Sequence, residues 1–321
     1  MGAVRRSLAV ASITMLSATA AFAQSATLTI GTASVGGTYY VYGEAIAKVL
    51  TEKTKYQVVP QQTQGPNQNI VMVDENKIEL GMVTMGVALQ GLRGSGSWTK
   101  GKKFENIRAL FPMYEMTLQC LALKKSGITS FSQLAGKTVG TGPKAGTPGT
   151  YFPLIFDALG MKVNVRNRQS ADQGVQLGDG VLDAFCFGAG LPIPVFSEVD
   201  SSQQVVFFTW TDAEIAAIRK ALPEFSESLI PKGFYKQQPA NQKTVGLFNF
   251  AIANKAMADD VAYVVTKTIL ENNAAMVRGH PAAKETIAAN ATRDSFLTFH
   301  PGAVRYYKEK GIKLDPGALP K

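Results

Sequence analysis

Two long, mostly apolar stretches, at residues 107–123 and 243–253, constrain the fold of this chain more than any other feature. Their sequences, IRALFPMYEMTLQCLAL and KTVGLFNFAIA, are extended in character, and each stands between two series of strand and helix patterns. Stretches of this kind suit connections that cross from one lobe of a protein to another, first outward and then back. The sequence therefore predicts two lobes that are joined by two crossings, with a cleft between them.

Both lobes alternate short strand patterns with helix patterns. We expect strands at 28–30, 57–60, 79–83, 138–141, 163–166, 183–187 and 205–208, with helices between them and three closing helices at 260–272, 282–291 and 301–310. This alternation is typical of parallel sheets with helices on both faces, in which ligands bind at the carboxyl ends of the strands. We expect an α/β fold, with lobe 1 formed by residues 24–115 and 240–321 and lobe 2 by residues 116–239.

The first 23 residues have the pattern of a secretory signal. Arg5 and Arg6 precede an apolar run at 8–21, which ends in the small-x-small sequence AFA at 21–23. We expect cleavage near Ala23 and a periplasmic location. The formal charge of +9 falls by the two arginines when this segment is removed. The remaining basic residues are scattered rather than clustered, which disfavours nucleic-acid binding and favours attraction of small acidic molecules.

The turn at residues 31–37 is a candidate anion-binding site. It follows the first strand and precedes a helix whose first amides lack partners, and Gly36 and Gly37 allow a ligand to approach the backbone closely. Residues 31–38 are spaced like a nucleotide-binding G-x-x-x-x-G-K-T loop, but Gly37 stands where the phosphate-binding lysine is required. We reject a nucleotide loop; an ordinary strand-to-helix turn remains the alternative.

Residues able to perform chemistry are scarce. Only two histidines occur, His280 and His300, each before a proline near a predicted helix start, and we expect structural roles for both. The sequence has no G-x-S-x-G, C-x-x-C, H-E-x-x-H or acidic calcium-loop motif. We therefore expect a binding protein rather than an enzyme, with no metal and no cofactor. For Cys120 and Cys186, two buried free thiols are favoured over a disulfide.

An ordered set of motifs resembles the TAXI group of solute-binding proteins, which serve tripartite ATP-independent periplasmic (TRAP) transporters. The set covers essentially the whole chain after the signal: IGTASVGGTYYVYGEAIAK (30–48), TQGPNQNI (63–70), ELGMV (79–83), GPKAGT (142–147), DAFCFGAGLP (183–192) and FHPGAVRYYKEKG (299–311). The resemblance implies a two-lobed type II periplasmic-binding-protein fold, in which the lobes close over a small ligand. It also implies a membrane permease partner that is driven by an ion gradient. We expect a monomer.

The resemblance also implies a binding site built from the turns between strands and helices. Carried over by position, the ligand-binding residues are Ser34, Val35, Gly36, Tyr39, Gln64, Gly65, Asn69, Thr84, Gln119, Lys144, Gly146, Thr147, Gly188 and Gly190. Backbone amides and hydroxyls of this set would hold a carboxylate, and Tyr39 would form a wall of the site. For Tyr40 and Tyr42 we expect core packing.

Three departures from the family pattern bear on the ligand. Lys144 replaces a glycine, Thr84-Met85-Gly86 replaces Q-S-D, and Gly188 replaces a threonine. The first change favours an anionic ligand, and the other two remove polar groups. We expect a carboxylate that needs no ammonium partner, such as a short organic or keto acid, with an acidic amino acid as the alternative. A binding protein of the same fold that serves a sensor or an ABC-type transporter, and a periplasmic enzyme on this fold, are the rival functions.

Overall fold

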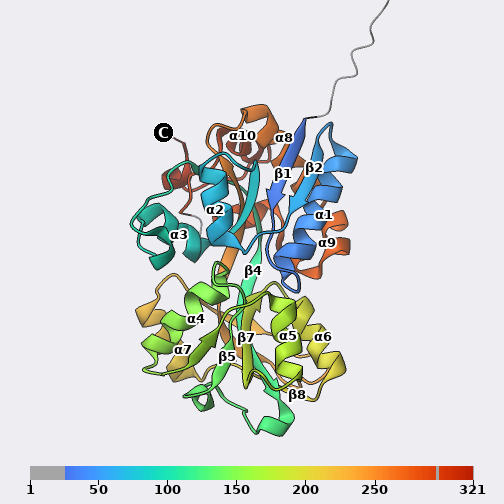
Figure 1. The fold of residues 1–321 in the computed structure, drawn as a ribbon. Helices are drawn as coiled ribbons and strands as arrows, with labels where there is room; N and C mark the ends of the chain where they lie inside the picture. The colour runs from blue at the N-terminus through green and yellow to red at the C-terminus, as the bar shows by residue number, and fades with distance from the viewer. Residues whose placement is uncertain (1–25, 294–295, 321) are drawn as a thin grey trace, which may run out of the picture.

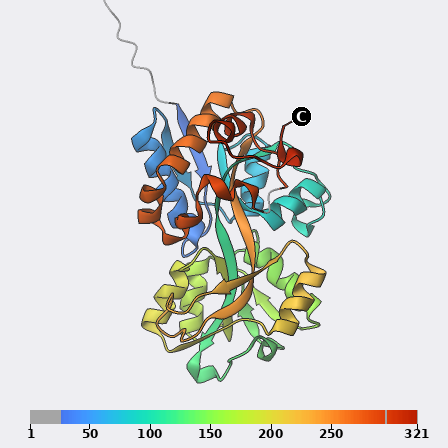
Figure 2. The same cartoon turned by 180° about the vertical axis from the view of Figure 1, so that it is seen from behind.

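The two apolar stretches form the two longest strands of the protein. The computed structural model describes residues 26–293 and 296–320, so the predicted secretory signal at 1–23 lies outside the described residues. Strands β4 (Ile107–Leu123) and β10 (Gln242–Asn254) run antiparallel to each other through two lobes. Figure 2 shows them side by side between the lobes. Almost all of their residues are buried, which explains their apolar sequence.

Ten strands of the described chain form one continuous mixed sheet. Lobe 1 contributes β1 (Thr27–Gly31), β2 (Gln57–Gln61) and β3 (Leu80–Thr84), and lobe 2 contributes β5 (Thr138–Gly140), β6 (Asn164–Arg166) and β7 (Ala184–Ala189). The order is β2-β1-β3-β10-β4-β7-β5-β6, with β8 (Val205–Phe208) beside β4 and β9 (Ser226–Ile230) beside β10. The expected parallel pairs are present in each lobe, but the crossing strands are antiparallel to their neighbours. They join what we expected as two parallel sheets into one.

Helices cover both faces of the sheet in each lobe (Figure 1). Lobe 1 carries α1 (Thr38–Lys53), α2 (Pro66–Asp74), α3 (Met85–Arg93), α8 (Asp259–Glu271), α9 (Asn273–Gly279) and α10 (Pro301–Glu309). Lobe 2 carries α4 (Thr147–Ala158), α5 (Ser170–Gly178), α6 (Pro194–Ser202) and α7 (Asp212–Ala221). Within residues 26–293 and 296–320, no helix has the length and apolar character needed to span a membrane.

The predicted helix at 282–291 is wrong, and the strand β9 was not predicted. Two short 3₁₀ helices, Pro281–Glu285 and Ala288–Thr292, occupy the place of that helix. Between them the buried Thr286 hydroxyl donates a hydrogen bond to the carbonyl of Met113 on β4 (2.9 Å), so a tertiary contact fixes the chain in a non-helical shape. β9 alternates between half-buried and exposed residues, which leaves little apolar pattern to detect.

The expectation of free thiols is corrected by the structure, in which Cys120 and Cys186 form a disulfide. The two residues are direct partners across the antiparallel pair β4–β7, with their Cα atoms 4.0 Å apart. Directly opposite residues of antiparallel strands bring their side chains close together. The two strands were predicted from the sequence, but their pairing and register were not, and these decide whether the sulfurs meet.

Candidate ligand-binding site

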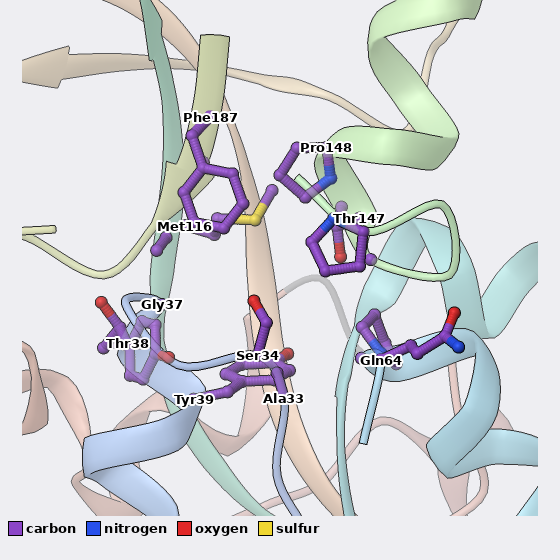
Figure 3. Close-up of a pocket in the computed structure, with 17 residues that line it drawn as sticks. Ala33, Ser34, Gly37, Thr38, Tyr39, Gln64, Met116, Thr147, Pro148 and Phe187 are labelled. Carbon is purple, nitrogen blue, oxygen red and sulfur yellow. The ribbon is translucent and has the colours of Figure 1, made fainter. Parts of the chain in front are cut away.

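A pocket lies between the two lobes, beside the crossing strands (Figure 3). It is partly open to solvent, and its lining is shared by the two lobes. The lining comes from the N-terminal ends of α1, α2 and α4, the end of β7 and the middle of β4. Its residues are Ala33, Ser34, Gly37, Thr38, Tyr39, Gln64, Gly65, Pro66, Tyr114, Met116, Pro143, Gly146, Thr147, Pro148, Phe187, Gly188 and Ala189.

Three helix N-termini meet at this pocket. The N-cap residues of α1, α2 and α4 are Gly37, Gly65 and Gly146, and no side chain caps any of the three helices. None of them has an acidic residue in its first turn. The first amides of a helix have no partner within the helix, and they carry a partial positive charge. At α2, however, Pro66 has no N–H, and the Asn67 amide donates to the Ala145 carbonyl (3.2 Å). The backbone donors that remain for an anion therefore come chiefly from α1 in lobe 1 and α4 in lobe 2.

The rest of the lining is mostly apolar. Phe187 and Met116 lie on one side in Figure 3, opposite Tyr39. Tyr39 and Tyr114 pack edge to face, with ring centroids 6.3 Å apart. Burial raises the pKa of both phenols well above the ordinary value, so both stay neutral near pH 7. An anion in the pocket therefore meets no repelling negative charge from these residues.

Charged side chains are absent from the described lining of the pocket. Lys144, which we expected to face the ligand, is exposed to solvent and does not line the pocket. Among the residues that the structure describes, no group of three or more His, Cys, Asp and Glu side chains could hold a metal ion. The arrangement can bind and orient a small molecule, but it brings no acid, base or nucleophile of strong reactivity to it.

Half of the predicted ligand-binding residues line this pocket. They are Ser34, Tyr39, Gln64, Gly65, Gly146, Thr147 and Gly188, together with Ala189 from the same turn. The structure thus brings all four predicted turns to one place between the lobes. The other half lie outside the lining.

Four of the outlying residues form contacts between the lobes instead. The carbonyls of Val35 and Gly36 accept hydrogen bonds from the amides of Ala171 (3.1 Å) and Val195 (3.0 Å) in lobe 2. The Thr84 hydroxyl lies 2.8 Å from the Thr147 hydroxyl. The Gly190 carbonyl accepts from the Thr38 hydroxyl (2.7 Å). The same turns that surround the pocket therefore also hold the lobes together.

Asn69 and Gln119 are buried side chains that hold the fold. Asn69 Nδ2 donates to the carbonyls of Thr32 (2.9 Å) and Met82 (3.0 Å), which joins α2 to β1 and β3. Gln119 lies on the face of β4 opposite Met116, because side chains alternate along a strand. Its Nε2 donates to Gln242 on β10 (2.6 Å).

Two of the residues that depart from the TAXI-like motifs, Gly188 and Gly86, have a packing reason. A Cβ at Gly188 would overlap the side chain of Leu118 on β4, so a threonine there would strike this neighbour. A Cβ at Gly86 would overlap the hydroxyl of Tyr151 and lie 2.9 Å from its Cζ. Tyr151 belongs to lobe 2, and its hydroxyl donates to Glu224 (2.8 Å). Gly86 thus allows the two lobes to approach each other.

Several lining residues were not predicted, although their elements were. Tyr114 and Met116 lie in the middle of the first crossing stretch, and Phe187 ends a predicted strand. Pro143 and Pro148 flank a predicted turn, and Thr38 begins a predicted helix. The available signal was their position at strand ends and turns, which is shared by many residues that line nothing.

Both histidines have the structural roles that we expected. His280 Nδ1 accepts from the amide of Ala282 and His300 Nδ1 accepts from the amide of Gly302, each at 3.2 Å. Each ring therefore caps the helix that begins at the following proline. Neither histidine lines the pocket.

Comparisons with known proteins agree on the fold. Residues 30–311 match the model of the NMT1-like family. The structure of the periplasmic binding protein BugD is similar, with a TM-score of 0.55 and 12% identity over 90% of this chain and 98% of that one. A structure from work on glutathione import via GshT and the cystine ABC importer TcyBC of Streptococcus mutans has a TM-score of 0.50. It is 15% identical over 82% of this chain and 97% of that one. At these identities the likeness concerns the fold alone, and it confirms the expected two-lobed periplasmic-binding-protein fold.

Proposed function

The chain belongs to the NMT1-like family, and from that membership and the pocket we propose that it is an extracytoplasmic solute-binding protein for a small carboxylate. Closure of lobe 1 over lobe 2 would enclose the ligand. The proposed boundaries are residues 24–115 with 240–321 for lobe 1 and 116–239 for lobe 2. The proposed location is the periplasm, with residues 1–23 removed.

The observation that carries this proposal is the meeting of the uncapped N-termini of α1 and α4, one from each lobe, at one pocket. A carboxylate is small enough to lie between them and can accept several amide hydrogen bonds at once. The Thr147 hydroxyl, from lobe 2, is a further donor, and so is the Ser34 hydroxyl, which also pairs with Ser170 (2.7 Å). Donors from both lobes would make ligand binding favour the closed form.

We further propose that the partner is a TRAP permease and that the chain is a TAXI-type subunit. The ordered motifs of the sequence support this, because the four turns that carry them are the turns around the pocket. An organic or keto acid is the preferred ligand, and an acidic amino acid is the alternative. Among the residues that the structure describes, no carboxylate lines the pocket to pair with an ammonium group, which favours the first.

Native mass spectrometry of the purified protein, followed by a thermal-shift screen of carboxylates, tests the ligand class. A bound carboxylate at a hundred times its dissociation constant stabilises the protein by about 2.7 kcal/mol. We expect a co-purified acid or a clear rise in melting temperature with at least one acid of the screen. A screen in which only cations or neutral compounds stabilise the protein would contradict the proposal.

Uptake into proteoliposomes tests the partner. We expect a gene for a multi-span permease to lie beside this one; that permease is reconstituted, and the loaded binding protein is added outside. We expect uptake that follows an imposed ion gradient and needs no ATP. Uptake that requires ATP hydrolysis would assign the protein to an ABC-type importer instead, and the ligand proposal would stand.

A further inference from the structure

We infer, on the basis of the proposed function, that the ligand is a monocarboxylate whose remaining atoms form an apolar body, branched or aromatic. The pocket has one region suited to an anion and one suited to hydrocarbon. The N-termini of α1 and α4 form the first, and the side chains of β4 and β7 with Pro66, Pro143 and Pro148 form the second.

The side chains of the apolar region are held in place by packing. Phe187 is 5% exposed and Met116 is 3% exposed. The Phe187 ring reaches from lobe 2 to the start of α1, because a Cβ at Gly37 would lie 3.6 Å from its Cζ. On the lobe 2 side, a Cβ at Gly142 would overlap the same ring. Gly142 therefore makes room for the aromatic ring at the pocket wall, and Gly37 lies in ordinary contact with it.

The lining holds no partner for a second charge. Within the part of the chain that the structure describes, no Lys, Arg or His lines the pocket, and no Asp or Glu does. Lys144 is exposed outside it. A second carboxylate on the ligand would be buried against Phe187, Met116 and the prolines without a cationic partner, which is costly in an apolar environment. The pocket therefore selects against dicarboxylates and against zwitterions.

Hydrocarbon added to the ligand should raise its affinity until the pocket is full. Phe187, Met116 and Pro148 line the pocket beside the helix N-termini, so hydrocarbon of the ligand would lie against apolar side chains. Burial of each additional methylene corresponds to about a fourfold gain in affinity. A carboxylate that lacks an apolar body would leave this gain unused.

Isothermal titration calorimetry of the exhaustively dialysed wild-type protein tests the inference with matched acids. The probes are butyrate, pentanoate and hexanoate, then 4-methylpentanoate and phenylacetate, and finally adipate and glutamate. Hexanamide replaces the carboxylate by a neutral group. We expect affinity to rise along the first series, and we expect adipate, which is hexanoate with a second carboxylate, to bind at least tenfold more weakly than hexanoate.

The outcomes separate this inference from the proposed function. Binding of adipate or glutamate as tight as that of hexanoate would overturn the inference and leave a carboxylate-binding protein. Binding of hexanamide as tight as that of hexanoate, or binding of none of the acids, would overturn the proposed function itself. If affinity rises from butyrate to hexanoate, adipate binds weakly and hexanamide does not bind, the result supports both the inference and the proposed function.

A pair of variants at the apolar wall gives a second test. Met116→Lys places a cation among the lining residues, and Met116→Leu is the matched apolar control. We expect Met116→Lys to raise the affinity for adipate at least tenfold relative to hexanoate, because a charge-assisted pair becomes available. Met116→Leu should keep the wild-type order. A folded Met116→Lys protein that still rejects adipate would contradict the inference, and if this variant does not fold, the wild-type series decides.

Discussion

Asn69 illustrates how a single motif residue can serve the fold rather than the ligand. Its side chain is fully buried and bonds to β1, β3 and the Thr63 hydroxyl, which donates to Asn69 Oδ1 (2.8 Å). A Cβ at Gly31 would lie 2.6 Å from the same Oδ1, so strand and side chain are in tight contact. The residue therefore positions the turn that precedes α2.

We predict that Asn69→Ala lowers the free energy of unfolding of the ligand-free protein by about 3 kcal/mol, because several buried carbonyls lose their donor. Urea unfolding followed by circular dichroism measures this change. Asn67→Ala on the same helix is the control, since the Asn67 side chain bonds to Thr150 in lobe 2 (3.1 Å) and should contribute less to the unfolding of lobe 1. If Asn69→Ala leaves the stability unchanged but abolishes carboxylate binding, Asn69 contacts the ligand and does not stabilise the fold.

The two histidines predict how stability depends on pH. Burial lowers the pKa of His280 and of His300 below the ordinary value of 6.5. Below about pH 6.5 the unfolded chain therefore binds protons that the folded chain does not, so stability falls as the pH falls toward the lowered values. His280→Asn and His300→Asn keep an acceptor for the capped amide and remove the titration. We expect the double variant to lose less stability than wild type between pH 7 and 5.5 in urea titrations; equal losses would refute this.

Single residues of the site could be predicted where they belong to a turn between a strand and a helix. Gly65 and Gly146 follow from the resemblance by position, and both line the pocket as the N-cap residues of α2 and α4. Phe187 and Met116 were not identified, because any strand contains such residues and only the packing of the lobes shows which ones face the ligand. Lys144 was chosen for its charge, but its exposure depends on the path of the turn.

At the scale of elements, β4 and β7 are joined covalently next to the pocket. The Cys120–Cys186 bridge lies one residue from Phe187 on β7 and spans 66 residues of sequence. A cross-link of this kind removes disorder from the unfolded chain. The disulfide therefore stabilises lobe 2 and the strand that carries the apolar wall.

We predict that the Cys120→Ala/Cys186→Ala protein unfolds with about 2–4 kcal/mol less free energy than the oxidised wild type. Guanidinium unfolding measures the difference. The free energy of unfolding of wild type should fall by a comparable amount under reducing conditions. Intact mass of the protein alkylated after denaturation reports the bridge directly. Two alkyl groups on the unreduced protein would show free thiols and remove the basis of the prediction.

The start of α4 is held to the end of β3 by two hydroxyls, those of Thr84 and Thr147. Because this bond joins the two lobes, it stabilises the closed form and not the open one. We predict that Thr84→Val weakens the binding of a carboxylate about fivefold, as expected for the loss of one hydrogen bond. Thr266→Val is the control, because the buried Thr266 hydroxyl has no partner among the described residues. Calorimetry with one stabilising acid measures both, and equal affinities of all three proteins would argue against the bond.

Most helices and strands could be predicted because their apolar periods are local. The segment after α9 could not, since Thr286 is held by a contact with Met113, which is far away in the sequence. The pairing of the strands could not be predicted for the same reason, because it also depends on contacts between residues far apart in the sequence. Two long apolar stretches indicate two crossings, but their antiparallel pairing and the single sheet that results depend on contacts between distant residues.

At the scale of the whole molecule, the proposed function requires the two lobes to approach each other closely. Gly86 on α3 faces Tyr151 and Glu224 of lobe 2, and a Cβ there would overlap the Tyr151 hydroxyl. Tyr151 is fully buried, and its hydroxyl is hydrogen-bonded to Glu224, so its side chain cannot easily move away from an added methyl group. Gly86 lies within a helix and needs no unusual backbone conformation. An alanine at this position therefore alters the contact between the lobes and little else.

We predict that Gly86→Ala leaves the free energy of unfolding of the ligand-free protein unchanged or raises it by up to about 1 kcal/mol, since alanine favours a helix. The same substitution should weaken carboxylate binding at least tenfold, because the closed form must displace a buried tyrosine. Small-angle X-ray scattering at saturating ligand should give a larger radius of gyration than for wild type. Gly91→Ala on the same helix is the matched control, since its Cβ would approach only Trp98 and Ile70 of lobe 1. If Gly86→Ala closes and binds as the control does, lobe closure does not depend on this contact, and the pocket must be completed by the turns at 63–69 and 142–147 alone.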